Sequence, residues 1–181
     1  MVMNYPQTAA TVASAPYDDY DWVDINNIKA DDASYAYCQL LGIATAYPYL
    51  IKASNFGFNF PSNYTILGIK AEECRKRVHL YNAYDSLIKA SKDGTNLVGS
   101  NMSIGSLWSI DWETHSWGSS TNLWGATWTP AEINDPNFSI FFGCYGDTGI
   151  IAAILYVQFV RVTVYVHVPE KGPLPLFRPK I

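Results

Sequence analysis

The residues best suited to recognition chemistry lie in one stretch, LWSIDWETHSWGSSTNLWGATWTP at 107–130, which contains five of the six tryptophans. Flat aromatic rings can stack against other ring systems such as sugars or nucleobases. The candidate ligand-binding set is Trp108, Trp112, His115 and Trp117, in a part of the stretch rich in Ser and Gly. For each of these tryptophans we favour burial in the core, with an interface or ligand platform as the alternative. For His115 we favour a packed or solvated side chain over an aromatic-rimmed binding site.

Catalytic residues follow no recognisable pattern. The three histidines lack a partner signature, and the chain contains no G-x-S-x-G, H-E-x-x-H or Gly-rich phosphate loop. Glu72 and Glu73 are adjacent in an expected strand and therefore point to opposite faces, which prevents them from acting as an acid/base pair. We expect a protein that is not an enzyme and that needs no cofactor.

A metal site is not predicted either. Acidic residues gather near the N-terminus, at Asp18, Asp19, Asp21, Asp24, Asp31 and Asp32. Calcium binds such oxygens, but the ligand spacing of a calcium loop is missing, and we favour a solvated acidic face. The mixed-charge run EECRKR at 72–77 is interpreted as a solvated or subunit-facing edge.

The composition indicates one domain with much protein-facing surface. The chain has 181 residues, enough to bury a core, and only 15% of them are charged, well below the usual quarter. Its 13 tyrosines suit interfaces, because a tyrosine combines apolar area with a polar tip. The formal net charge of -4 argues against a nucleic-acid partner, which would need a basic patch.

Cysteine usage and hydropathy bear on the compartment. Cys38, Cys74 and Cys144 are odd in number and far apart, so we expect neither a disulfide framework nor a zinc site, and a reducing compartment during synthesis. No Lys or Arg precedes Lys29, so a signal peptide is not expected. The apolar segment 150–168 includes an arginine, and a charge near the bilayer centre costs about 3 kcal/mol. We therefore reject a membrane span.

Hydrophobic periodicity predicts strands along most of the chain. The clearest lies in 150–168, where alternate residues from Val160 to Val168 form one face and polar residues ending at His167 form the other. Gly68 suggests a bulge, and Asp93 followed by Gly94 marks a hairpin. Further strands are expected at 22–28, 35–41, 47–60, 66–78 and 138–146. The pattern predicts an all-β protein, an antiparallel jelly-roll β-sandwich.

One short helix is predicted in TWTPAEIND. Thr129 can cap it, Pro130 occupies its first position and Glu132 completes a capping box, while the next proline ends it after about one turn. Trp124 and Trp128 adjoin this turn and are expected to be buried, so that truncation to Ala would cost about 3–5 kcal/mol.

Three regions are expected. Residues 1–21 form an N-terminal arm, 22–168 form the sandwich, and 169–181 form a Pro-rich C-terminal arm that cannot pair as an inner strand. Subunit contacts are expected in the arms, at Tyr5, Tyr17, Leu174, Leu176, Phe177 and Arg178.

Three motifs resemble a single known module. The module's "L-K-A-S/T-N-F-G-F-x-I-P" and "I-x-G-I-x-V-E-I-x-R" are matched by residues 50–77, LIKASNFGFNFPSNYTILGIKAEECRKR. Its "D-L-W-G-x-T-W-T-P-A-D-I-N-x-x-N-F-G-V" resembles residues 122–142, NLWGATWTPAEINDPNFSIFF. Its "V-D-x-V-x-I-T-V-Y-Y" resembles residues 157–166, VQFVRVTVYV. This is the jelly-roll β-sandwich module of tailed-bacteriophage virion proteins. The likeness covers roughly residues 22–168, with departures at Ser139, where the module has Gly, and at Cys144.

The resemblance implies a structural part of a virion, synthesised in the host cytoplasm, that contacts major capsid or tail proteins and itself as a homo-oligomer. Our first expectation is a capsid decoration or cement protein on the head exterior, because negative charge suits the outside of the shell. A tail, neck or fibre component comes second. From a different class, a carbohydrate-binding module or receptor adhesin would hold a host glycan on exposed tryptophans. We expect no nucleic-acid or membrane partner.

Overall fold

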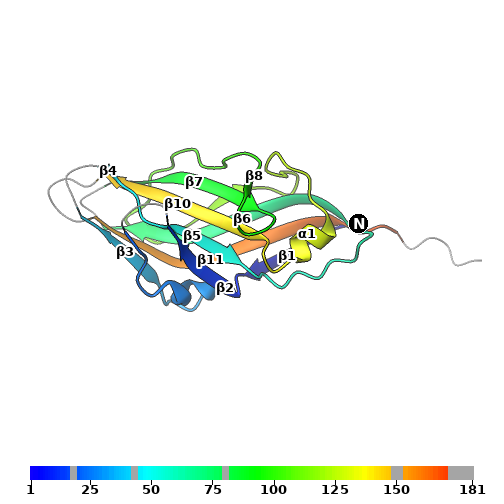
Figure 1. The fold of residues 1–181 in the computed structure, drawn as a ribbon, viewed down its shortest axis with the longest axis horizontal. Coiled ribbons are helices and arrows are strands. Elements are labelled where there is room, and N and C mark those ends of the chain that lie inside the picture. Colours follow the sequence, from blue (N-terminus) through cyan, green and yellow to red (C-terminus); the bar gives the residue numbers. More distant parts are fainter. Residues whose placement is uncertain (17–19, 42–44, 79–81, 148–152, 171–181) are drawn as a thin grey trace, which may run out of the picture.

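A computed structural model describes residues 1–16, 20–41, 45–78, 82–147 and 153–170. In these residues two antiparallel sheets pack face to face as a sandwich that is elongated along its strands (Figure 1). The first sheet, here sheet A, is built around the long strand β11 (Ala153–His167). On one side β11 pairs with β6 (Thr65–Arg77), and on the other with β1 (Val2–Thr8) and β3 (Ala36–Leu40). The edge strand β9 (Glu113–Gly118) pairs with β6.

The second sheet, sheet B, is built in the same way around its own central strand. It consists of β10 (Ser139–Asp147), flanked on one side by β7 (Ala83–Ser91) and β8 (Leu97–Val98), and on the other by β5 (Leu50–Ser54), β4 (Thr45–Ala46) and β2 (Thr11–Ala15). The chain passes from one sheet to the other at nearly every connection, which is jelly-roll topology. The predicted fold class is confirmed.

The core lies between the two sheets. From β11 it takes Val160, Val162, Val164 and Val166, each with no exposed surface, as the strict alternation of that strand predicted. The predicted irregularity near Gly68 is confirmed as a change of register between β6 and β11 next to this glycine. The predicted hairpin is also confirmed, since β7 pairs with β8 across the Asp93–Gly94 turn.

The predicted N-terminal arm is wrong for most of its residues. β1 lies along the edge of β11 that β3 leaves unpaired, and β2 lies along β5, so each sheet gains a strand. Pairing satisfies backbone groups of β11 that would otherwise form an open edge. Tyr5 lies in β1 and packs edge-on against Phe60 with ring centroids 5.1 Å apart, so it is part of the sandwich, and the subunit contact expected at Tyr5 stays a prediction. Tyr17 and the C-terminal positions Leu174, Leu176, Phe177 and Arg178 lie outside the described residues.

Two predicted strands also differ. Residues 22–28 do not form a strand but lead into a 3-10 helix, η1 (Ile25–Lys29), because Asp24 has a left-handed backbone with φ of 57° that interrupts extended structure. In 47–60 only β5 forms a substantial strand. Beyond it, Phe56, Phe58 and Phe60 are buried side chains that close one end of the sandwich.

The short helix is confirmed as α1 (Pro130–Asn134) with its capping box. The Thr129 hydroxyl accepts from the Glu132 backbone N–H at 3.3 Å, and the Glu132 carboxylate accepts from the Thr129 N–H at 2.8 Å. Trp124 is 0% and Trp128 7% exposed, as predicted. The Trp124 indole N–H donates to the Ile69 carbonyl at 2.9 Å, which ties this corner to β6.

Candidate functional site

The four residues of the predicted ligand-binding set do not form one platform. Trp108 is 1% and Trp117 4% exposed, and both belong to the core. His115 is half-buried and packs against Trp117 with ring centroids 4.9 Å apart, with the Ser106 hydroxyl 3.5 Å from its Nε2. Trp112 is the one fully surface-lying residue of the four, at 38% exposed, so its expected burial is wrong. The set is therefore divided between the interior and the surface.

Trp112 lines a groove on the outer face of sheet A. The groove has a volume of about 440 Å³ and is lined by Ala33, Tyr35, Lys76, Val78, Trp112, Tyr156 and Gln158; we call it the aromatic groove. Tyr35 lies edge-on to Tyr156 with centroids 5.2 Å apart, and Trp112 lies edge-on to Tyr156 at 6.4 Å. Three mutually inclined rings form its apolar wall, and two of them, Tyr35 and Trp112, are exposed.

Strand register positions the groove. Tyr156 points outward from β11 because its neighbours Leu155 and Val157 are fully buried in the core. Lys76 of β6 is directly opposite Tyr156, and its ammonium lies 4.7 Å from the Trp112 ring centroid and 5.3 Å from that of Tyr156. A cation at these distances is attracted to the faces of both rings. The groove thus combines ring surfaces with a hydrogen-bond donor placed between them.

Gln158 supplies the polar end of the groove. Like Tyr156, it points to the outer face by the alternation of β11, and it lies where the β11–β6 register shifts. The Gln158 Oε1 accepts a hydrogen bond from the Cys74 thiol at 3.3 Å. The buried Cys74 side chain, on the same outer face of sheet A, therefore holds the orientation of the amide.

The segment that carries Trp112 is anchored from inside the sandwich. The Trp108 indole N–H donates to Asp85 Oδ1 at 3.1 Å, and the Trp108 carbonyl accepts from Arg77 Nε at 2.8 Å. The Glu113 carboxylate accepts from the Ser109 N–H at 3.2 Å. Trp112 is thus held between two fixed points, which favours a preformed groove.

The inner anchor belongs to a buried ion cluster, which we define as Glu73, Arg75, Asp85 and Glu113. Arg75 is 0% exposed and forms an ion pair with Asp85 across the sandwich. Its other partners are Glu73 and Glu113, each at 3.5 Å. The Arg75 guanidinium also lies 4.8 Å from the Trp108 ring and 5.2 Å from the Trp117 ring. The interpretation of 72–77 as a solvated or subunit-facing edge is wrong here, since alternation turns Glu73 and Arg75 inward.

Burial shifts the protonation of this cluster. Burial raises the pKa of Glu73 to about 7, against the opposing attraction of Arg75. Burial, reinforced by the Arg75 charge, lowers the pKa of His115. The pKa of the Cys144 thiol, which is also buried, is raised. Near neutral pH the interior therefore holds a carboxyl group poised to gain or lose a proton.

Two carboxyl groups of the cluster are buried away from solvent. Glu73 and Asp85 are each 2% exposed, so no substrate atom reaches them from solvent. Glu72, on the opposite face of β6, binds Lys70 and Arg161 at 3.0 Å each, which confirms that the two adjacent glutamates point apart. Within the described ranges, no group of three or more His, Cys, Asp or Glu side chains could hold a metal ion.

The tryptophan-rich stretch 107–130 indicated Trp112 as a candidate site residue, whereas Tyr35, Lys76 and Tyr156 were not predicted as site residues. Tyr156 could have been found from the alternation of β11, which places it with Arg161 on the outward face once the bulge at Gln158 is counted. Tyr35 could not have been found in this way, because its approach to Tyr156 depends on the antiparallel pairing of β3 with β11.

Comparisons with known proteins give distant structural similarities alone. No protein-family model matches the sequence, and no curated protein matches it. Among solved structures, the family 11 carbohydrate-binding module of the cellulosomal cellulase Lic26A-Cel5E of Clostridium thermocellum is similar at 12% identity, with 89% of this chain and 86% of that chain covered and a TM-score of 0.37. The CBM22-1–GH10 modules of xylanase Xyn10B from the same organism, complexed with xylohexaose, are similar at 7% identity over 95% of this chain and 30% of that chain, with a TM-score of 0.36. At this level of similarity neither match assigns a ligand to this chain.

No helix among the described residues is long and apolar enough to cross a membrane.

Proposed function

We propose that this chain is a non-catalytic module that binds a glycan in the aromatic groove. The observation that carries the proposal is the cluster of Tyr35, Trp112 and Tyr156 on the outer sheet face, with the Lys76 ammonium over the rings of Trp112 and Tyr156. A sugar ring presents an apolar C–H face and a polar rim. The exposed part of the Trp112 side chain suits the first, and Lys76 and Gln158 suit the second.

The interior supports this use of the surface. Ligand pockets that bind without a large entropic cost are already formed in the absence of ligand. Trp112 meets this condition because the segment on either side of it is fixed by Trp108 and Glu113. Lys76 keeps its side chain over the rings, where its ammonium can exchange a ring contact for sugar hydroxyls.

The test is binding of the purified chain to soluble cello-, xylo-, manno- and chito-oligosaccharides and to bacterial O-antigen polysaccharide, measured by titration calorimetry. We expect at least one of these probes to bind, and Trp112→Ala to lower its affinity about tenfold or more, since an aromatic contact contributes about 0.5–1.5 kcal/mol beyond its buried area. Tyr145→Ala is the matched control, because Tyr145 stacks on Tyr84 at 5.2 Å in sheet B. Equal affinities of the Trp112 variant and the wild type, or no binding to any probe, would refute the proposal.

We also propose that the module works within a phage virion, as a head-exterior decoration protein or as a tail, neck or fibre component. The virion-module motifs support this, and so do three exposed apolar side chains on one segment, with Ile104 84%, Leu107 49% and Ile110 49% exposed. Such side chains would be covered in a contact with another virion protein. A glycan-binding module could serve such a particle in host adsorption.

This second proposal is tested on particles assembled with and without the chain. A decoration protein remains bound to purified heads and makes them more resistant to heat or low salt, and Ile104→Ser weakens its retention. Heads of equal resistance in both preparations would contradict a cement role. Retention on isolated tails alone would assign the tail alternative.

A further inference from the structure

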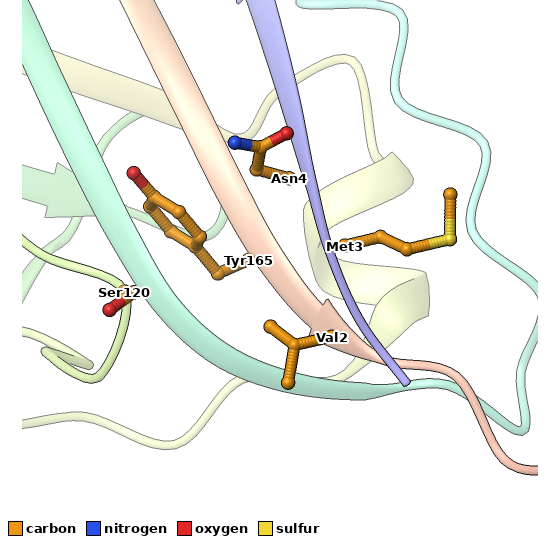
Figure 2. A pocket seen from close by; sticks show the side chains of 5 residues that line it. All are labelled: Val2, Met3, Asn4, Ser120 and Tyr165. Carbon is orange, nitrogen blue, oxygen red and sulfur yellow. The ribbon is translucent and has the colours of Figure 1, made fainter.

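The outer face of sheet A has a second hollow, at the opposite end of β11 from the aromatic groove. It is lined by Val2, Met3, Asn4, Ser120 and Tyr165 and has a volume of about 430 Å³; we call it the Tyr165 hollow (Figure 2). In Figure 2 the Tyr165 ring lies between Asn4 on one side and Ser120 on the other, with Val2 beside it. One aromatic ring is thus flanked by an amide and a hydroxyl group.

Two structural features build this hollow. Asn4 is directly opposite Tyr165 in the pairing of β1 with β11, so the added N-terminal strand forms one wall. On the other side Tyr165 is opposite Gly68 of β6. A Cβ at Gly68 would lie 2.3 Å from the Ser119 carbonyl oxygen and 2.4 Å from the Ser120 carbonyl carbon, so only glycine lets this turn lie flat against the strand and form the second wall.

The hollow and the aromatic groove share one face and one strand. Tyr156 and Tyr165 both point outward and are half-buried, whereas Val160 and Val164 between them point into the core. Tyr165 follows Tyr156 by nine positions, which corresponds to roughly 25–30 Å along a strand. This length exceeds a single sugar ring several times over.

Polar side chains connect the two hollows. Lys70 and Arg161 lie between them on the outer face, with 29% and 34% of their side chains exposed, and both are held by Glu72 at 3.0 Å. Fixed donors of this kind can hydrogen-bond sugar hydroxyl groups along the path without a large loss of side-chain entropy.

We infer that the Tyr165 hollow is a second sugar subsite, and that the ligand is an extended polysaccharide lying along β11 from Trp112 to Tyr165. One ring of the chain stacks in the aromatic groove and another stacks on Tyr165. The Asn4 amide and the Ser120 hydroxyl hydrogen-bond the rim of this second ring. The inference rests on the proposed glycan binding and adds the form of the ligand to it.

The test uses a length series of whichever oligosaccharide of the panel binds the intact chain, from the disaccharide to the longest soluble member. In the wild type we expect the affinity to rise with length until both subsites are spanned, and then to level off. Tyr165→Ala should lower the affinity for the longest members about tenfold and leave that for the disaccharide unchanged. Trp112→Ala should weaken binding at every length.

The outcomes separate the two claims. If Trp112→Ala weakens binding while Tyr165→Ala has no effect at any length, the second subsite is refuted and the proposed function stands. If affinity does not depend on length in the wild type, the extended ligand is refuted in the same way. If no probe binds, both fail. Tyr165→Phe retains the ring and should bind the long members as the wild type does, and the circular dichroism of Tyr165→Ala, compared with that of the wild type, controls for folding.

Discussion

Glu73→Gln should abolish a pH dependence of stability that the buried ion cluster creates. In the folded chain the pKa of Glu73 is raised from 4.5 to about 7, so the folded state retains a proton that the unfolded chain releases. The free energy of unfolding therefore falls as the pH rises through this window, by 1.36 kcal/mol for each pH unit. The total loss is about 3 kcal/mol, complete just above pH 7. Glutamine carries no charge and should remove this loss, making the variant the more stable protein at about pH 8.

The assay is urea unfolding followed by tryptophan fluorescence between about pH 5 and pH 8. His115 acts in the opposite direction, since its pKa is lowered in the folded state and its contribution to stability is lost as the pH falls below 6.5. It is present in both proteins, so the difference between wild type and Glu73→Gln isolates the carboxyl group. A difference that stays constant across this range would refute the reasoning, because Glu73 would then titrate as it does in the unfolded chain.

Three further substitutions test other parts of the account. Asp85→Asn leaves Arg75 buried against two remaining carboxylates and should lower the free energy of unfolding in urea by about 3–5 kcal/mol. It should also weaken glycan binding, because it releases the anchor of the Trp112 segment. Unchanged stability would contradict the ion pair. Trp124→Ala removes a fully buried indole and should lower the free energy of unfolding by about 3–5 kcal/mol. A urea midpoint equal to that of the wild type would contradict this. Thr129→Ala should cost about 1 kcal/mol through the lost cap, whereas Thr129→Ser should retain most of it.

The fold was predictable because its strongest signals are local. The valine alternation of β11 and the capping box of α1 depend on residues next to each other in sequence, and both are found where they were expected. The prediction of an N-terminal arm was wrong because residues 2–8, VMNYPQT, alternate weakly and include a proline. Its strand forms only because β11 offers a free edge, and Pro6 is tolerated at such an edge.

The site was predictable only in part, for the same physical reason. Trp112 could be named from the stretch 107–130, but its exposure could not be separated from the burial of Trp108 and Trp117 without the pairing of β9 with β6. The burial of Arg75 was not predicted from the sequence. Strand alternation alone allows an inward position, but a charged side chain is usually exposed. A charged residue is placed inside only when long-range partners such as Asp85, ten positions away on the other sheet, surround it.

The most direct test of glycan recognition at Trp112 is the indole N–H region of a nitrogen–proton correlation spectrum, recorded while the binding oligosaccharide is titrated. The chain has 6 tryptophans and therefore 6 such signals, which single substitutions assign. We predict that the Trp112 signal shifts in proportion to ligand occupancy, while those of Trp108, Trp117 and Trp124, which are at most 4% exposed, keep their positions. A saturating titration in which the Trp112 signal does not move would contradict the proposed site.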